Sequence, residues 1–184
     1  MEKIRFSIDE LSIRRLTPAD YESLQDFSCG VEALDRFFHH EIGLCARYHY
    51  LTPFCVVLHG EIVAVFTLSN DSLVLENDEK EDFPNLNEDY REFFLEQFTY
   101  PAVNIGHLGV RHDLQSMGIG DTVVRYVWTT FSEYDITGCQ FITVDSLNNA
   151  RTNKFYSRLG FQNQTNKDHM ALTRRMFLEL FTHL

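Results

Sequence analysis

The sequence predicts an α/β (α+β) fold, a mixed β-sheet with helices on its faces. Strand and helix patterns alternate along the second half of the chain, which is typical of such sheets. In the first half, two apolar, β-branched and aromatic runs, 54–59 and 62–68, flank Gly60-Glu61 and predict a β-hairpin. A chain of 184 residues is long enough to bury one core. We therefore expect a single domain over 1–184, with an acidic insertion at about 76–98.

The first half is expected to begin with strands over 4–8 and 11–16. Thr17-Pro18 resembles an N-cap followed by proline at the first helical position, so a short helix toward Leu24 is predicted. The segment Phe27–Gly30 interrupts the pattern. A second helix over 31–45 is predicted from apolar residues at helical spacing.

The second half is expected to contain a strand over 101–110 and a helix over 120–131. A strand over 141–144 and a helix over 149–159 follow, and Gly160 is expected at the C′ position of that helix. Two final strands are predicted over 161–164 and 169–174. The side chains of His39-His40 and Arg174-Arg175 are expected at solvent-facing or edge positions.

The net charge of −11 disfavours binding of a nucleic-acid backbone by the domain as a whole. The negative charge is uneven, because residues 76–98 hold nine acidic and two basic side chains. This leaves the remaining surface nearly balanced, so a local basic patch is compatible with the sequence. The acidic segment is most simply a solvated flap, and a cationic partner such as a polyamine is the alternative.

No apolar run approaches the roughly 18 to 20 residues of a membrane-spanning helix. The N-terminus lacks the apolar stretch of a secretory signal, so we expect a cytoplasmic protein with no membrane contact. The four cysteines form no CxxC pair, and the histidines lack zinc-ligand spacing. We therefore expect reduced cysteines and no metal site.

The strongest chemical signal is a glycine-containing loop between a predicted strand and a predicted helix. Its sequence is Gln115-Ser116-Met117-Gly118-Ile119-Gly120. Successive backbone N–H groups at a helix N-terminus bind anions, and glycine lets the backbone approach a pyrophosphate closely. The loop is not a P-loop, because no Lys-Ser/Thr follows Gly120, and it lacks the first glycine of a dinucleotide fingerprint. Alone, it is equally compatible with a plain turn before a helix.

A second motif follows in the predicted helix, turn and strand after Asn149. It consists of Phe155-Tyr156 and then Leu159-Gly160-Phe161. In this order the two motifs resemble those of the GNAT superfamily of acyl-CoA N-acyltransferases. The resemblance implies a GNAT-like mixed, mostly antiparallel central sheet with helices on both faces. It also implies an acetyltransferase that uses acetyl-CoA as co-substrate and acylates a primary amine directly, without a covalent enzyme intermediate.

An upstream segment carries a finer resemblance. Phe27-Ser28-Cys29-Gly30, followed by Leu34-Asp35-Arg36-Phe37, is similar to the opening of the toxin branch of GNAT proteins, which acetylates aminoacyl-tRNA. That branch implies tRNA as a partner, which the acidic charge disfavours. It also implies an antitoxin arm as a second possible cationic partner of the acidic segment, besides a polyamine. The main expectation is therefore an unidentified amine acceptor. A toxin acting on aminoacyl-tRNA and a catalytically silent acyl-CoA-binding or partner-binding module are the alternatives, and a homodimer is compatible with each.

The resemblance also implies roles for individual residues. Tyr156 is the expected general acid, which protonates the departing thiolate. Asn149 is expected either to bond the pantetheine amide or to act as a helix N-cap. The residues expected to bind acetyl-CoA are Leu108, Gly109, Val110, Gln115, Ser116, Met117, Gly118, Ile119, Gly120, Asp121 and Asn149.

The predicted strand 101–110 is expected to contact the pantetheine arm, and it is also where a general base would be sought. Main-chain groups of 108–110 are expected to pair with the pantetheine arm, and an N–H there could stabilise the oxyanion. Many family members place a glutamate on this strand, where this chain has Asn104, which is no useful base. His107 titrates in a suitable range but is expected to be buried for structural reasons. An acceptor amine of low pKa needs little base, which fits the toxin-like branch.

Overall fold

The computed structural model describes residues 6–80 and 88–180. The chain divides into two units. Unit 1 comprises Met1–Ser69 and Ile105–Tyr126, and unit 2 comprises Asn70–Asn104 and Val127–Leu184. The chain passes from one unit to the other at three places, which lie inside β3 (Glu61–Val74), β4 (Thr99–Val110) and α6 (Ile119–Ser132).

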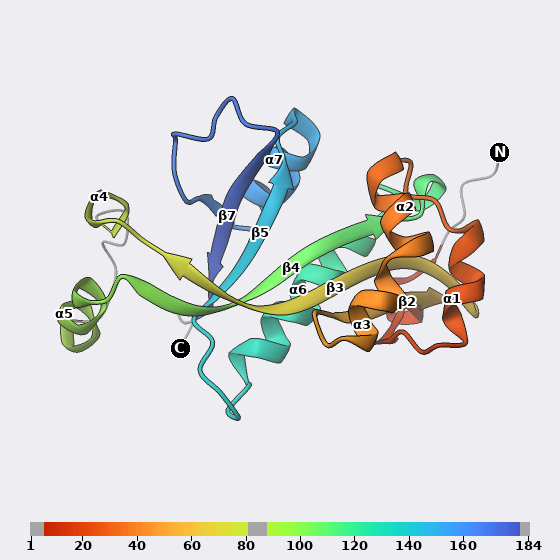
Figure 1. Ribbon diagram of the computed structural model, residues 1–184, viewed down its shortest axis with the longest axis horizontal. Helices are drawn as coiled ribbons and strands as arrows, with labels where there is room; N and C mark the ends of the chain where they lie inside the picture. The colour runs from red at the N-terminus through yellow and green to blue at the C-terminus, as the bar shows by residue number, and fades with distance from the viewer. Residues whose placement is uncertain (1–5, 81–87, 181–184) are drawn as a thin grey trace. The chain divides into compact units, whose positions relative to one another are not determined.

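The strands form one seven-stranded sheet in the order β1-β2-β3-β4-β5-β7-β6 (Figure 1). Besides β3 and β4, its strands are β1 (Ser12–Arg15), β2 (Thr52–Leu58), β5 (Phe141–Leu147), β6 (Gln162–Asn163) and β7 (Thr173–Glu179). Strand β4 pairs with β5 in parallel, whereas β1 with β2, β2 with β3, and β7 with both β5 and β6 pair antiparallel. The predicted mixed, mostly antiparallel sheet is confirmed.

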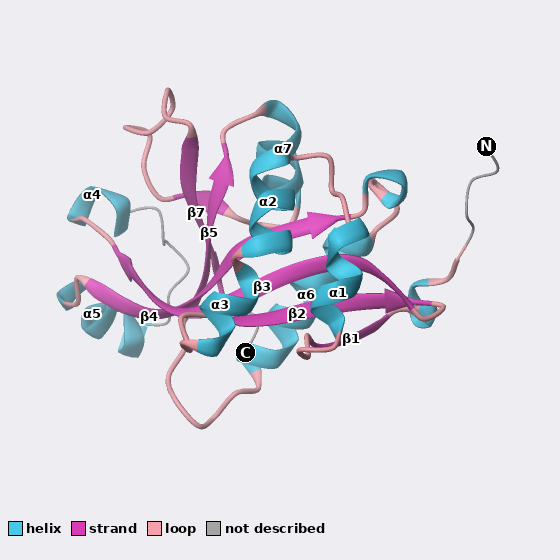
Figure 2. Cartoon of the chain, turned by 45° about the vertical axis from the view of Figure 1, so that its right-hand side comes forward, coloured by secondary structure: helices cyan, strands magenta, loops and turns pink. Residues whose placement is uncertain are grey.

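In unit 1, helices cover both faces of the β2–β3 hairpin. The hairpin turns at His59 and Gly60, both with positive φ. Cys55 and Val65 face a core built by α1 (Asp20–Ser23), α2 (Glu32–His40) and α3 (Ile42–Arg47). Strand alternation turns Phe54 and Phe66 to the other face. There the two rings stack at 5.1 Å and contact Tyr126 of α6. Figure 2 shows α1–α3 gathered along β2 and β3.

Unit 2 is built around an aromatic core. Its buried members are Leu73, Leu75, Phe94, Tyr100, Ala102, Phe141 and Phe177. Helix α5 (Glu88–Glu96) contributes Phe94, and α7 (Ala150–Arg158) packs on β5. The short α4 (Asn77–Lys80) ends at Lys80, whose buried ammonium donates to the Leu95 carbonyl across 2.9 Å.

The predicted acidic insertion falls on α4 and α5, and its middle, 81–87, lies outside the described residues. The single domain and the insertion therefore stay predictions. Among the described helices, none combines the length and the apolar character needed to cross a membrane.

Several sequence predictions were wrong in detail. Thr17 is not the N-cap of the first helix, since α1 begins at Asp20 with Ala19 at the N-cap position. Residues 6–8 of the predicted first strand do not join the sheet. A 3-10 turn, Ile8–Glu10, follows Ser7, whose N–H donates to Glu10 Oε1 across 2.6 Å. Residues 4 and 5 of the predicted strand lie outside the described residues. The second helix is broken at Glu41 into α2 and α3. The last strand starts at Thr173, since Asn148 Nδ2 donates to the carbonyls of His169 and Ala171 and holds that segment as a loop.

Candidate active site

The glycine-containing loop of unit 1 has a curled backbone and leads directly into a helix. Ser116 and Gly118 have φ values of +64° and +89°, and α6 begins directly afterwards at Ile119. A positive φ at two nearby positions curls the backbone so that successive N–H groups converge. The N–H groups of residues 116–120 lie in this curled segment and in the first turn of α6. These donors at the start of a 14-residue helix fit the diphosphate of acetyl-CoA.

The end of β4 leads into this loop. Gly109 is buried, and a Cβ there would lie 2.6 Å from Cε2 of Phe38 and 3.1 Å from Cβ of Cys29. Only glycine therefore lets α2 approach this close to the strand. Arg111, which follows the last residue of β4, pairs with Glu61 and Asp113 at 2.8 Å each, so its charge is already paired.

Gln115 plays a part that the sequence did not predict. Its Nε2 donates to the carbonyls of Cys29 at 2.7 Å and Val110 at 3.0 Å. The side-chain amide hydrogens are therefore engaged by the fold, and the predicted contact of Gln115 with acetyl-CoA is left to its other groups. The sequence holds no local signal for this bond, because 86 residues separate Cys29 from Gln115.

Tyr156 lies on α7 in unit 2 with 7% of its surface exposed. Its ring contacts Phe155 and Phe161 edge-on, at 4.9 and 5.2 Å between centroids. Burial raises the pKa of its hydroxyl above the ordinary value, so the group stays protonated at neutral pH. Among the described residues its hydroxyl has no hydrogen-bond partner. The hydroxyl therefore carries its proton at neutral pH, while the raised pKa makes it a weaker acid than an ordinary tyrosine.

Asn149 caps α7. Its Oδ1 accepts from the Thr152 N–H at 3.0 Å and from the Thr152 hydroxyl at 3.1 Å. The N-cap alternative is confirmed, and the bond to pantetheine stays a prediction that would use Nδ2. At the other end of the helix Gly160 has a φ of +92°, as expected for the C′ position.

No base is evident on β4. Asn104 is buried and donates through Nδ2 to the carbonyl and the hydroxyl of Thr143. His107 stacks on Phe37 with 3.7 Å between ring centroids, and its Nδ1 lies 3.1 Å from Thr67 Oγ1. Burial lowers the pKa of His107, so the ring is neutral at pH 7. The structural interpretation of His107 is thus supported.

Three of the four cysteines, Cys29, Cys55 and Cys139, lack the properties of nucleophiles. Burial raises the pKa of Cys29 to about 12, with the neighbouring Asp35 adding to the effect, and raises those of Cys55 and Cys139 to about 11. These groups are therefore thiols, and not reactive thiolates, at neutral pH. This agrees with direct acetyl transfer.

Helix α7 carries a basic face that sequence analysis did not single out. Arg151, Lys154 and Arg158 are exposed, and their spacing places them along one side of the helix. Residues 146–167 contain four basic and no acidic side chains. This composition contrasts with the net charge of −11 and could have been found from the sequence by counting charges in windows.

The dipeptides expected at solvent-facing or edge positions are more engaged than predicted. His39 Nε2 lies 2.7 Å from the Phe27 carbonyl oxygen, whereas His40 is exposed. Arg174 pairs with Asp168 at 3.1 Å, and Arg175 pairs with Asp145 at 2.9 Å and also with Asp71. Each of these partners is distant in sequence or lies in a loop, so the pairing depends on tertiary structure.

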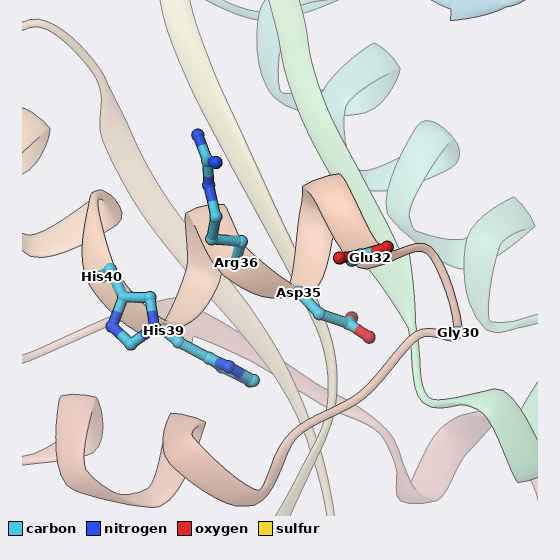
Figure 3. Close-up of a pocket in the computed structure, with 6 residues that line it drawn as sticks. All are labelled: Gly30, Glu32, Asp35, Arg36, His39 and His40. Carbon is cyan, nitrogen blue, oxygen red and sulfur yellow. The ribbon is translucent and has the colours of Figure 1, made fainter.

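An open hollow of about 460 Å³ lies over α2. It is lined by Gly30, Glu32, Asp35, Arg36, His39 and His40 (Figure 3). Arg36 points to the opposite side of the helix from Asp35 in this view. Asp35 and His39 already bond the segment 27–30, so their polar atoms serve the fold.

Comparison with known proteins assigns the family. The model of the acetyltransferase (GNAT) family matches residues 12–161. The chain belongs to this family. This membership confirms two predictions, an N-acetyltransferase and acetyl-CoA as its co-substrate. The comparison with curated proteins gives no match.

Solved structures of GNAT toxins share the fold. A mutant of the toxin AtaT bound to the C-terminus of the antitoxin AtaR and acetyl-CoA is 23% identical, with a TM-score of 0.70 and 94% of each chain covered. A mutant of KacT is 20% identical, with a TM-score of 0.74 and coverage of 93% of this chain and 95% of that one. AtaT complexed with acetyl-methionyl-tRNAfMet is 24% identical, with a TM-score of 0.71 and coverage of 92% and 94%.

Proposed function

We propose that this GNAT protein transfers the acetyl group of acetyl-CoA to the α-amino group of an aminoacyl-tRNA. The basic face of α7 is the observation that carries this acceptor. Tyr156, the proposed proton donor, lies on the same helix as Arg151, Lys154 and Arg158. A polyanion that binds these three basic side chains would therefore lie along that helix. Phosphate contacts supply most of the affinity of proteins for nucleic acids.

Two groups of main-chain atoms in unit 1 would bind acetyl-CoA. The N–H groups of residues 116–120 would hold the diphosphate, and main-chain groups of 108–110 would pair with the pantetheine arm. The acceptor amine attacks the thioester carbonyl, and an N–H of residues 108–110 would stabilise the oxyanion. Tyr156 would then donate its proton to the departing thiolate.

The lack of a carboxylate base on β4 agrees with this acceptor. Asn104 cannot accept a proton usefully, and the His107 ring is held between Phe37 and Thr67. An α-amino group has a pKa of about 8, against about 10.4 for a lysine side chain, so much of it is already neutral near pH 7.5. An aminoacyl ester therefore needs less help from a base than a lysine or a polyamine does.

The neighbours give further support. AtaT has been solved with acetyl-methionyl-tRNAfMet and, separately, with an antitoxin segment and acetyl-CoA. An aminoacyl-tRNA acceptor also implies the cytoplasm as the place of action and fits four free cysteines. We further propose that the whole chain works as one catalytic domain.

The test is an acetylation assay with purified protein, acetyl-CoA and a panel of aminoacyl-tRNAs, in which N-acetyl-aminoacyl products are resolved. The variant is Arg151→Gln, Lys154→Gln and Arg158→Gln together. We expect its KM for aminoacyl-tRNA to rise at least about tenfold. The slope of log K for tRNA binding against log salt concentration should become less steep by roughly 0.9 for each lost phosphate contact.

The matched control replaces three exposed arginines of unit 1 with the same change of net charge, namely Arg15→Gln, Arg36→Gln and Arg47→Gln. Its KM for tRNA should stay near that of the wild type. Acetylation of a polyamine or a lysine peptide but of no aminoacyl-tRNA would refute this acceptor. Binding of acetyl-CoA without turnover on any of these amines would instead favour a silent acyl-CoA-binding module.

A further inference from the structure

The segment 27–30 is bonded to the entrance of the glycine-containing loop. The backbone N–H of His112 donates to the Ser28 carbonyl at 3.0 Å, and Gln115 Nε2 donates to the Cys29 carbonyl at 2.7 Å. The same Nε2 donates to the Val110 carbonyl at 3.0 Å. One side-chain amide thus joins three points: the segment 27–30, the end of β4 and the first residue of the loop.

Asp35 of α2 fixes the other side of that segment. Its Oδ1 accepts the Cys29 N–H at 2.8 Å, and its Oδ2 accepts the Ser28 hydroxyl at 2.7 Å. Ser28 Oγ in turn accepts the Gly30 N–H at 3.2 Å. Burial acts to raise the pKa of Asp35, but the hydrogen bonds that it accepts outweigh burial and lower it, so Asp35 is ionised at neutral pH. Figure 3 shows Asp35 beside the turn that leads to Gly30.

Two glycines allow this close contact. Gly30 has a φ of +78°, and a Cβ there would lie 2.9 Å from Cδ2 of His112. At Gly109, a Cβ would meet both Phe38 of α2 and Cys29. The contact between segment 27–30 and residues 109–115 is therefore too tight to tolerate side chains at either glycine, and its hydrogen bonds have little room to shift.

We propose that Asp35 and Gln115 are positioning residues, which set the conformation of the loop 115–120 through the backbone of segment 27–30. This inference rests on the proposed acetyl-CoA site. The positioning roles explain why segment 27–30 and Leu34-Asp35 occur together in the sequence. Asp35 accepts a hydrogen bond from the Cys29 N–H, and the Cys29 carbonyl accepts one from the Gln115 side chain. Residues that hold a binding group from behind are often worth as much affinity as the group itself.

The first test compares acetyl-CoA binding by calorimetry. Gln115→Glu places a carboxylate against two carbonyl oxygens, and Asp35→Asn removes one of two acceptors. We expect each to weaken acetyl-CoA binding at least about tenfold. Asp35 bonds residues 28 and 29 and not the strand 108–110, so use of S-acetylpantetheine, which lacks the diphosphate, should change by less than about threefold in Asp35→Asn. A general loss of structure would affect both donors alike.

Unit 1 offers matched controls for both substitutions. Gln25 Nε2 donates to the His39 carbonyl at 2.9 Å, and Asp20 accepts from the Thr17 N–H and hydroxyl at 2.7 Å each. Gln25→Glu removes an equivalent bond without touching the loop, and Asp20→Asn removes equivalent bonds and also weakens the ion pair of Asp20 with Arg14 at 2.7 Å. We expect acetyl-CoA affinity within about twofold of the wild type for both controls. Gln115→Met, which removes the amide without adding charge, replaces Gln115→Glu if the latter does not fold.

Hydrogen exchange of the free protein decides the inference independently of acetyl-CoA. The amides of His112, Leu114 and Thr122, which donate to the Ser28, Arg111 and Gly118 carbonyls around the loop, should exchange faster in Gln115→Glu and Asp35→Asn than in the two controls. If exchange and affinity of both variants match the controls, the inference is overturned. If wild-type protein fails to bind acetyl-CoA, the proposed function fails, and the exchange comparison alone supports or overturns the positioning roles.

Discussion

Gly109 lies against the ring of Phe38, so closely that a Cβ at residue 109 would stand 2.6 Å from Cε2 of that ring. Gly109→Ala is therefore expected to lower the free energy of unfolding by about 1–3 kcal/mol, because the crowding must be relieved by shifting α2 or the strand. Urea denaturation measures this. Gly138→Ala, where the nearest atom lies 3.9 Å away, should cost less than about 1 kcal/mol. Combining Gly109→Ala with Phe38→Leu should recover part of the loss, and strictly additive losses would contradict the steric explanation.

Tyr156→Phe separates catalysis from stability. The hydroxyl has no bonding partner among the described residues, so its removal should change the free energy of unfolding by less than about 0.5 kcal/mol. We expect kcat to fall by about 10²–10⁴-fold with little change in the acetyl-CoA KM, measured by CoA release.

Tyr100→Phe is the matched control for this experiment. The Tyr100 hydroxyl donates to the carbonyls of Phe94 and Gln97, so its loss should reduce stability while the folded protein keeps its kcat. Equal kcat values for wild type and Tyr156→Phe would exclude Tyr156 as the general acid.

The buried thiols predict direct transfer. A pKa of about 12 leaves Cys29 roughly one part in 10⁴ ionised at pH 8, and the pKa values of about 11 at Cys55 and Cys139 keep these groups largely protonated as well. We expect iodoacetamide at pH 8 to leave all three unmodified in the folded protein, and acetyl transfer to continue. Mass spectrometry should detect no acetyl thioester on the enzyme during turnover. An acetylated cysteine that disappears on addition of the acceptor amine would contradict direct transfer.

His107 predicts a pH dependence of stability. Its pKa is lowered in the folded protein by burial, so the unfolded chain binds more protons in the interval between the folded value and about 6.5. Stability should therefore rise with pH through that interval and fall as pH drops from about 7 toward 5. Replacing the ring by His107→Gln should flatten this part of the profile, measured by urea denaturation at pH 7.5 and 5.5. An unchanged slope would show that other groups cause it.

Local patterns in the sequence specified much of the fold. Glycines at 118 and 160 adopt positive φ where a loop or a helix end needs it, and residue type alone indicates this. The helix predicted over 120–131 is α6, Ile119–Ser132, since its apolar spacing is regular. The helix after Asn149 also starts where predicted, because an asparagine cap is a short-range interaction with Thr152.

Long-range contacts decided what the sequence left open or mispredicted. The second helix is split at Glu41, and β7 starts later than predicted. The late start of β7 depends on a distant side chain, since Asn148 Nδ2 donates to the carbonyls of His169 and Ala171. Arg174 and Arg175 find carboxylates that no local pattern pairs with them.

By itself the sequence indicated the family, which the family comparison confirms, and predicted an anion-binding loop and a candidate acid, because each depends on residue types at fixed short spacing. Only the tertiary structure showed that the amide of Gln115 is bonded to Cys29 and that Asp35 holds the same segment. It also showed that Tyr156 is buried with its hydroxyl unbonded among the described residues. Burial and hydrogen-bond partners are properties of segments brought together from distant parts of the chain, which spacing along the sequence does not encode.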